Sequence, residues 1–193
     1  MKDLSVPEKV LASAFQSVTT RTAGFASVSQ SGLTESSRLL GCILMFIGGS
    51  PAGTAGGIKT TAFAMLALTV ISVLRGHKDT ECFGRRMDVD SVRSALTITL
   101  ITFTCWLTAV AAMSIFDPQT EFLNLMYEAS SAIGTVGLSA DLTPHLTRAS
   151  HVVLMLLMYI GRIGPLTMAL VFAGKSNKSD KFRELPEKKI MLG

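Results

Sequence analysis

The sequence predicts an all-α membrane protein built from short helical repeats, and three observations support this fold class. Only 17% of the residues are charged, against about 25% in a typical soluble domain. Residues 39–58 and 94–116 carry no charge, and each run is long enough to cross a bilayer. A Thr-x-Gly motif also occurs twice, once in each half of the chain. This composition excludes an ordinary soluble enzyme, a disordered chain and a disulfide-rich scaffold.

Three apolar stretches, residues 39–74, 94–116 and 149–174, predict three membrane crossings. The two charged segments after the first and third stretches, 75–93 and 175–193, hold most of the Lys and Arg residues. Cytoplasmic segments of membrane proteins are enriched in these residues. We therefore expect a multi-pass protein of the cell membrane with both charged segments in the cytoplasm. The basic residues are interpreted as topology signals, and no nucleic-acid partner is predicted.

The first apolar stretch is too long for one straight helix. As a single helix it would reach about 54 Å, against a hydrocarbon core of about 30 Å. Glycine and proline interrupt it, and non-helical backbone at membrane depth is tolerated only inside protein or along a water-filled cavity. We therefore expect residues 48–61 to form a glycine-rich loop on an aqueous path. Its candidate residues are Gly48, Gly49, Ser50, Pro51, Ala52, Gly53, Thr54, Ala55, Gly56, Gly57 and Lys59.

Two copies of one structural unit are predicted, because residues of the first half recur at a constant offset in the second. Both copies open with a helix start signal, a capping box at Ser5 to Glu8 and the pair Asp117-Pro118. The helices expected to follow, 6–19 and 118–132, are too short to cross a membrane. Each is therefore expected to enter the membrane from outside and to return through a Thr-x-Gly turn, which gives a membrane helix, pore helix, filter loop and membrane helix plan.

The Thr-x-Gly turns suit cation binding through the backbone. Glycine permits a positive φ, so successive carbonyl oxygens can face one axis and replace the hydration shell of a cation. The threonine hydroxyls add oxygen ligands, and the carbonyl end of each short helix carries a negative partial charge. The predicted filter residues are Thr20, Arg21, Thr22, Ala23, Gly24, Phe25, Ile133, Gly134, Thr135, Val136, Gly137 and Leu138.

Residues 17–25, 48–61 and 131–139 together resemble the Trk/Ktr/HKT superfamily of potassium transporters. This resemblance implies a pore of four units that selects potassium at the filter in a sodium-responsive way, with loop 48–61 as a gate. Residues 1–74 would then be a partial third repeat and residues 94–174 the complete fourth, so that one and a partial repeat are present. Either the chain is the C-terminal part of a longer polypeptide, or another chain supplies the remaining repeats.

The resemblance also implies partners. Family members pair as homodimers in the lipid bilayer and sit on a cytosolic nucleotide-binding ring of the KtrA/TrkA type. The loop 75–93 and the tail 175–193 are the segments expected to face this ring. This chain has no dinucleotide motif, so we expect it to bind no cofactor besides the potassium ion, or sodium as an alternative ion, and the nucleotide to lie on the ring.

Three charged residues fall in or beside the predicted membrane elements. Arg162 interrupts an apolar run and is expected to line the pore, where its charge would limit cation occupancy; a salt bridge to Glu128 is the alternative. Arg21 is expected to point behind its filter loop, towards carbonyls or Glu128. Lys59 either tethers the loop to a carboxylate or extends to the inner surface.

Other functions are weaker interpretations of the sequence. A secondary transporter could use the broken helix as a solute site, and a non-conducting assembly module is a third hypothesis. A nucleotide-binding loop is excluded because Ile58 separates Gly57 from Lys59 and no strand precedes the glycines. No catalytic constellation stands out, so the chain is not expected to be an enzyme. The cysteines are too far apart to predict a disulfide or zinc site.

Overall fold

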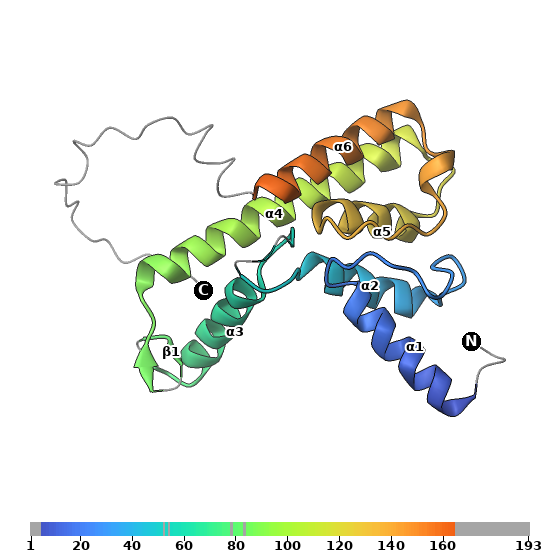
Figure 1. The fold of residues 1–193 in the computed structure, drawn as a ribbon. Helices are drawn as coiled ribbons and strands as arrows, with labels where there is room; N and C mark the ends of the chain where they lie inside the picture. Colours follow the sequence, from blue (N-terminus) through green and yellow to red (C-terminus); the bar gives the residue numbers. More distant parts are fainter. Residues whose placement is uncertain (1–4, 52, 54, 78, 83, 165–193) are drawn as a thin grey trace.

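A computed structural model of the chain describes residues 5–51, 53, 55–77, 79–82 and 84–164, and these are mainly helical, as predicted. The elements are α1 (Val6–Thr19), α2 (Glu35–Phe46), α3 (Thr60–Leu74), β1 (Glu81–Cys82), β2 (Arg85–Arg86), α4 (Val89–Phe116), α5 (Phe122–Ile133), the 3-10 turn η1 (Thr143–His145) and α6 (Arg148–Ile163). Figure 1 shows α4 as the longest helix, with α6 and α5 beside one half of it and α3 near the other.

The helix α4 has the length and composition of a membrane span. It contains 28 residues and is, within the described part of the chain, the one helix long and apolar enough to cross a bilayer. It begins at Val89 because the Asp88 carboxylate accepts a hydrogen bond from the Ser91 amide at 3.2 Å. The helix thus contains the whole predicted apolar stretch 94–116, and its charged first turn extends into the segment expected to be a loop.

The first predicted crossing is two helices, as the length argument required. Helix α2 ends at Phe46 and α3 begins at Thr60. The chain between them leaves and returns to nearly the same point, since Ile47 and Ile58 form a parallel β-bridge and the Ile58 amide donates to the Phe46 carbonyl at 3.1 Å. The predicted interruption is confirmed. For the third crossing, α6 is described as far as Ile163, and residues 165–174 lie outside the described residues.

The charged segment after α3 contains a short antiparallel hairpin that the sequence did not predict. Glu81 pairs with Arg86, and Cys82 pairs with Arg85. Asp79 forms an ion pair with Arg86 at 3.1 Å. The hairpin therefore presents exposed arginines beyond the end of α3.

The two short helices are present, but only the first starts where its signal predicted. Helix α1 has the expected bounds and its capping box, with the Ser5 amide 2.8 Å from the Glu8 carboxylate. Helix α5 begins at Phe122 instead of Pro118. The Asp117 carboxylate is engaged elsewhere, because it accepts hydrogen bonds from Ser150 and from the amide of Thr147 (3.1 Å) at the start of α6.

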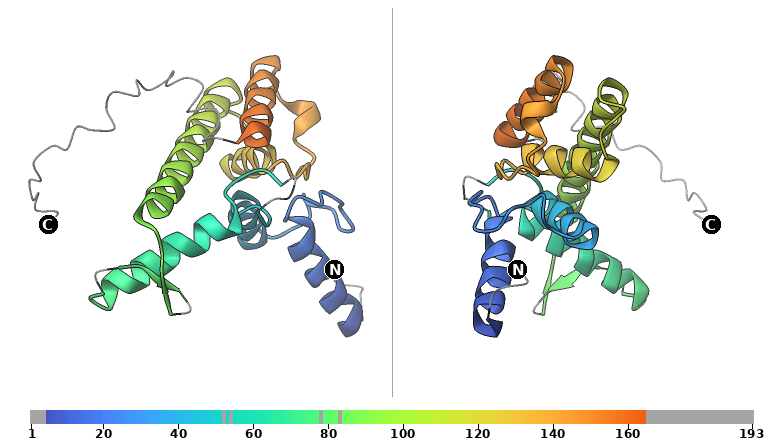
Figure 2. Two further views of the ribbon diagram at one scale, coloured as in Figure 1. Left: turned by 60° about the vertical axis from the view of Figure 1, so that its left-hand side comes forward. Right: turned by 90° about the vertical axis from the view of Figure 1, so that its right-hand side faces the viewer.

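The helices differ in how much of their surface is covered. Helix α5 is the most enclosed, because it packs against α2, α4 and α6, and most of its second half is buried. Helix α1 projects from the other helices (Figure 2) and exposes apolar side chains, among them Val6 (74%) and Leu11 (70%). The short helix of the second copy is thus packed against three other helices, whereas that of the first leaves an apolar face open.

Candidate functional site

The two predicted filter loops follow directly after α1 and α5. In the first loop Thr22 and Gly24 have φ angles of 68° and 76°, and in the second Thr135 and Gly137 have φ angles of 52° and 90°. Positive φ at a β-branched residue is uncommon and costs about 1–3 kcal/mol. The same strained conformation therefore occurs at corresponding positions of both copies, on alternate residues.

The amide groups of both loops point back at the short helices. In the first loop, the Ala23 and Gly24 amides donate to the Thr19 carbonyl, each at 3.2 Å. In the second loop, the Val136 amide donates to the Ser131 carbonyl at 2.9 Å, and the Gly137 amide donates to the Ser131 hydroxyl at 3.1 Å. These amides are therefore satisfied within each copy. In the first loop the Phe25 carbonyl is also engaged, because it accepts a hydrogen bond from the Thr19 hydroxyl at 2.6 Å.

The two loops lie against one another although they are far apart in sequence. A Cβ atom added to Gly24 would lie 2.1 Å from the Val136 carbonyl oxygen and 3.9 Å from the Gly137 Cα. Glycine is therefore required at position 24 both by its φ and by this close backbone approach. The arrangement brings Gly24 and Gly137 to one place, as a shared filter requires.

The second filter loop is more buried than the first, just as α5 is more buried than α1. Ile133, Gly134, Val136 and Leu138 are buried, with Thr135 half-buried and Gly137 exposed. In the first loop the buried residue is Thr20, whose hydroxyl donates to the Ser17 carbonyl at 2.8 Å, whereas Arg21, Ala23 and Phe25 are exposed and Thr22 and Gly24 half-buried.

Arg21 links the first filter loop to the glycine-rich loop. Its Nη1 atom donates to the Ile47 carbonyl at 2.8 Å and to the Gly48 carbonyl at 3.1 Å. The side chain thus points to carbonyls behind its own loop, which is one of the two alternatives predicted for it. Ile47 and Gly48 directly follow the end of α2, and we call this pair of residues the neck of the glycine-rich loop.

The second filter loop contacts the glycine-rich loop directly. The Gly56 amide donates to the Thr135 hydroxyl at 3.0 Å, and a Cβ atom at Gly56 would lie 2.7 Å from both the Cγ2 and Oγ1 atoms of Thr135. The neighbouring Gly57, at φ 69°, approaches the Phe46 carbonyl oxygen. Glycine is therefore needed at the tip because the filter lies against it.

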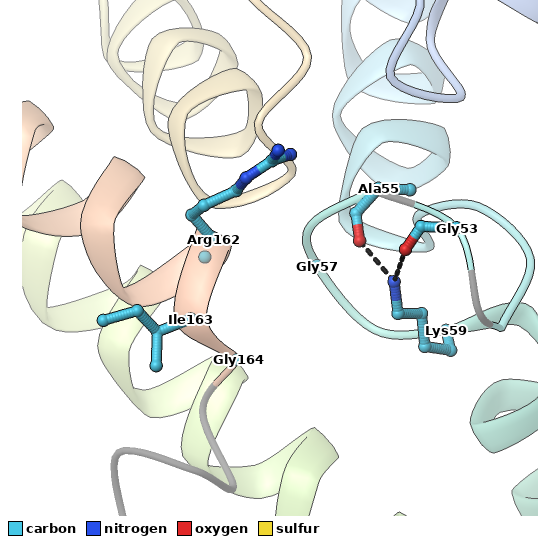
Figure 3. A pocket seen from close by; sticks show the side chains of 8 residues that line it. Gly53, Ala55, Gly57, Lys59, Arg162, Ile163 and Gly164 are labelled. Atoms are coloured by element: carbon cyan, nitrogen blue, oxygen red, sulfur yellow. Dashed lines mark hydrogen bonds between the residues drawn. The ribbon is translucent and has the colours of Figure 1, made fainter.

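Lys59 closes the glycine-rich loop on itself. Its ammonium group donates to the Ala55 carbonyl and, at 3.4 Å, to the Gly53 carbonyl (Figure 3). Of the two predicted roles, neither the carboxylate tether nor extension to the inner surface describes these contacts. Within the same loop, Gly48 is buried, Gly49 is half-buried, and Ser50 and Pro51 are exposed. Ala52 and Thr54 lie outside the described residues.

Arg162 lies across a cavity from the glycine-rich loop. The cavity has a volume of about 330 Å³, and its lining includes Gly53, Ala55, Lys59 and Arg162. Figure 3 shows the Arg162 side chain extending from the end of α6 towards this space. Next to it, Gly161 is packed so closely that an added Cβ would lie 2.2 Å from the Ile133 carbonyl oxygen. The end of α6 therefore touches the base of the second filter loop.

Glu128 holds the segment that directly follows the second filter loop. Its buried carboxylate accepts hydrogen bonds from the Ser139 hydroxyl at 2.5 Å, the Ala140 amide at 3.1 Å and the Thr143 hydroxyl at 2.8 Å. Glu128 was predicted from the sequence only as a partner of Arg162 or Arg21. Its position among small and apolar residues of a short helix was the signal that it holds a neighbouring loop.

The two short helices, each followed by a strained loop, meet beside a broken helix, and α4 has the length and composition of a membrane span. This arrangement fits an all-α membrane transport protein. The chain belongs to the TrkH family, described as cation transport proteins, whose family model matches residues 1–184. Its relatives are transport proteins, which confirms that it is not an enzyme.

Curated relatives match nearly the whole chain. Ktr system potassium uptake protein B of Bacillus subtilis is 37% identical over 190 residues, which cover 98% of this chain and 42% of the relative. Potassium/sodium uptake protein NtpJ of Enterococcus hirae is 36% identical over 189 residues, 96% of this chain and 42% of the relative. Ktr system potassium uptake protein B of Vibrio alginolyticus is 34% identical over 193 residues, all of this chain and 42% of the relative. The chain thus spans about two fifths of the length of these relatives.

Proposed function

We propose that the chain supplies two filter strands and the gate of a pore for potassium uptake across the cell membrane. The observation that carries the proposal is the pair of Thr-x-Gly loops, which share alternating positive φ angles and meet at Gly24 and Val136. Backbone carbonyls arranged around one axis replace the water of a dehydrated cation. The names of the relatives, potassium and potassium/sodium uptake proteins, favour potassium, with sodium as the alternative ion.

The glycine-rich loop is proposed as the gate. It is held by Arg21 at its neck and by Thr135 at Gly56, so these few hydrogen bonds favour a position directly against the filter. A segment that is rich in glycine can exchange between two arrangements separated by a few kcal/mol. Release of the Gly56 contact would move the loop away from the filter and let ions pass.

Arg162 and Lys59 are proposed to set the electrostatic barrier below the filter. Both line the cavity between α6 and the glycine-rich loop. Fixed positive charge beside a pathway of low dielectric repels cations and so limits how many occupy it. Such a barrier suits regulated uptake better than free conduction.

Two filter strands cannot surround an ion, so the remaining pore repeats must come from the rest of the same polypeptide or from another chain. The exposed apolar face of α1 is where such a repeat would pack. We further propose a homodimer that works with other subunits, since the Bacillus subtilis and Vibrio alginolyticus relatives are both named as proteins of a Ktr system. The exposed hairpin of segment 75–93 is the proposed contact with a cytosolic nucleotide-binding ring of the KtrA/TrkA type.

The test of the filter is Gly137→Ser in the complete transporter that contains this chain. Nothing lies within 4 Å of an added Cβ at Gly137, so the substitution acts through the φ of 90°. We expect potassium to lose its preference over sodium in uptake assays, because serine resists this conformation by about 1–2 kcal/mol.

Gly76→Ser is the matched control for this test. Gly76 has a φ of 75° and equally open surroundings, but it lies just after the end of α3. Unchanged potassium selectivity in the Gly137 variant, or uptake that requires an organic solute, would contradict the proposal and favour a secondary transporter.

A further inference from the structure

A buried glutamine lies behind the first filter loop. Gln30 follows that loop closely in sequence and is 3% exposed. Its Oε1 atom accepts hydrogen bonds from Gln16 of α1 at 2.6 Å and from the Tyr127 hydroxyl of α5 at 2.8 Å. Its Nε2 atom donates to the Val28 carbonyl at 2.7 Å and to the Gln16 Oε1 atom at 3.2 Å.

These four contacts use the full hydrogen-bonding capacity of the Gln30 amide, which has two donor hydrogens and two acceptor lone pairs. The orientation of the amide is fixed, because the Val28 carbonyl accepts hydrogen bonds and does not donate them. The Oε1 atom must therefore face Tyr127, and the Tyr127 hydroxyl must be the donor. A polar group this deeply buried is retained without cost to stability only when it is fully satisfied, as here.

Tyr127 connects this network to the second filter loop. Its side chain is fully buried in a cluster with Val136 and Leu138 of that loop. On the other side, an added Cβ at Gly41 of α2 would lie 3.1 Å from the Tyr127 ring. One side chain thus packs behind the second filter loop and hydrogen-bonds the segment that follows the first.

The corresponding contact in the second copy shows which part of the network is additional. Thr143 occupies the position in the second copy that Gln30 occupies in the first, and its hydroxyl donates to Glu128 of the short helix before it. In both copies, therefore, the returning segment is tied to its own short helix, by Gln16 in the first and by Glu128 in the second. The Tyr127 hydroxyl has a different role, because it joins the two copies to one another.

We propose that Tyr127 and Gln30 are positioning residues for ion selection, which hold the two filter loops at a fixed separation. This inference rests on the filter proposed above. A filter distinguishes ions by the number and placement of its carbonyl ligands. The first loop is exposed and lies on a sparsely packed helix. Two hydrogen bonds therefore fix it relative to the second loop: the buried one from Tyr127 of the well-packed α5, and an exposed one from the Ser31 hydroxyl to the Asp141 carboxylate at 2.7 Å.

The test is Tyr127→Phe in the complete transporter, with potassium and sodium uptake measured separately. The substitution removes one hydroxyl and keeps the ring in its cluster. Loss of a hydrogen bond worth about 1 kcal/mol corresponds to about fivefold, and we expect the ratio of potassium to sodium uptake to fall by about this factor. The amount of protein in the membrane and its melting temperature should change little, which separates positioning from folding.

Two variants make the outcome decisive. Tyr159→Phe is the matched control, because Tyr159 is the other of the two tyrosines and is 60% exposed on α6. Gly137→Ser tests the filter itself. If Gly137→Ser alters selectivity and Tyr127→Phe does not, the positioning role is wrong and the filter stands; if neither alters it, the proposed filter is wrong as well.

Gln30→Met gives a second measurement if Tyr127→Phe fails to reach the membrane. Methionine keeps the length of the buried Gln30 side chain while removing the oxygen that accepts the Tyr127 hydroxyl. We expect a loss of selectivity in the same direction. Parental selectivity in this variant would overturn the inference.

Discussion

The contact between Gly56 and Thr135 gives the sharpest prediction about gating. In Gly56→Ala, the new methyl group would lie 2.7 Å from the Cγ2 and Oγ1 atoms of Thr135 and 3.0 Å from the Gly134 carbonyl oxygen. All three distances are too short for a methyl group. Either the loop tip moves away from Thr135 or the Thr135 side chain rotates, and in both cases the hydrogen bond from the Gly56 amide to the Thr135 hydroxyl weakens.

The size of this effect follows from the cost of overpacking, which is about 1–3 kcal/mol for an added methyl group in a well-packed site. The penalty applies to the closed arrangement, in which the loop tip touches Thr135, and not to an open one. At about 1.4 kcal/mol for each factor of ten, the ratio of open to closed loops should rise by about 5- to 140-fold. Potassium uptake by the complete transporter in the absence of the proposed cytosolic ring should therefore increase.

Gly53→Ala is the control for the gating experiment. Gly53 lies in the same loop, but an added Cβ would meet the Ser50 carbonyl oxygen at 3.4 Å, an ordinary contact. The assay is the initial rate of potassium uptake by cells that lack other uptake systems, with and without the cytosolic partner. A Gly56→Ala rate equal to the parent or to Gly53→Ala would refute the idea that this contact holds the gate closed.

Two further predictions concern the ends of the helices. Desolvation raises the pKa of Asp117, but hydrogen bonds from Ser150 and Thr147 lower this pKa by a larger amount, so it lies below its usual value. The ionised carboxylate therefore stabilises the fold above the pKa of the unfolded chain, and this stabilisation is lost as pH falls through the folded pKa. Asp117→Ala should therefore lower the melting temperature at pH 7, and the difference from the parent should shrink as pH falls towards about 3; a constant difference would contradict the role of the carboxylate. Charge reversal in the hairpin, Arg85→Glu with Arg86→Glu, should weaken binding of the proposed cytosolic ring, measured by pull-down against the exposed Arg148→Glu at the start of α6 as control; affinity equal to the parent would remove the hairpin from the interface.

Several features of the fold and the site could be predicted from the sequence because they depend on local chemistry. The capping box at Ser5 sets the start of α1, and the glycines between Phe46 and Thr60 interrupt the helix as expected. The start of α5 was missed for a physical reason. Asp117-Pro118 is a valid helix start, but the Asp117 carboxylate binds the first turn of α6, and such competition between distant partners leaves no mark on the local sequence.

The sequence by itself predicted apolar membrane helices, a break in one of them and two similar loops proposed to bind cations, since these predictions follow from charge spacing, glycine content and repetition. The tertiary structure alone decided what each polar side chain holds. Arg21 donates a hydrogen bond to the start of the glycine-rich loop, Thr135 accepts one from Gly56 in that loop, and Tyr127 donates one from the second copy to the first. Hydrogen bonds between residues so far apart in the chain depend on how the helices pack, and packing is a property of the whole fold.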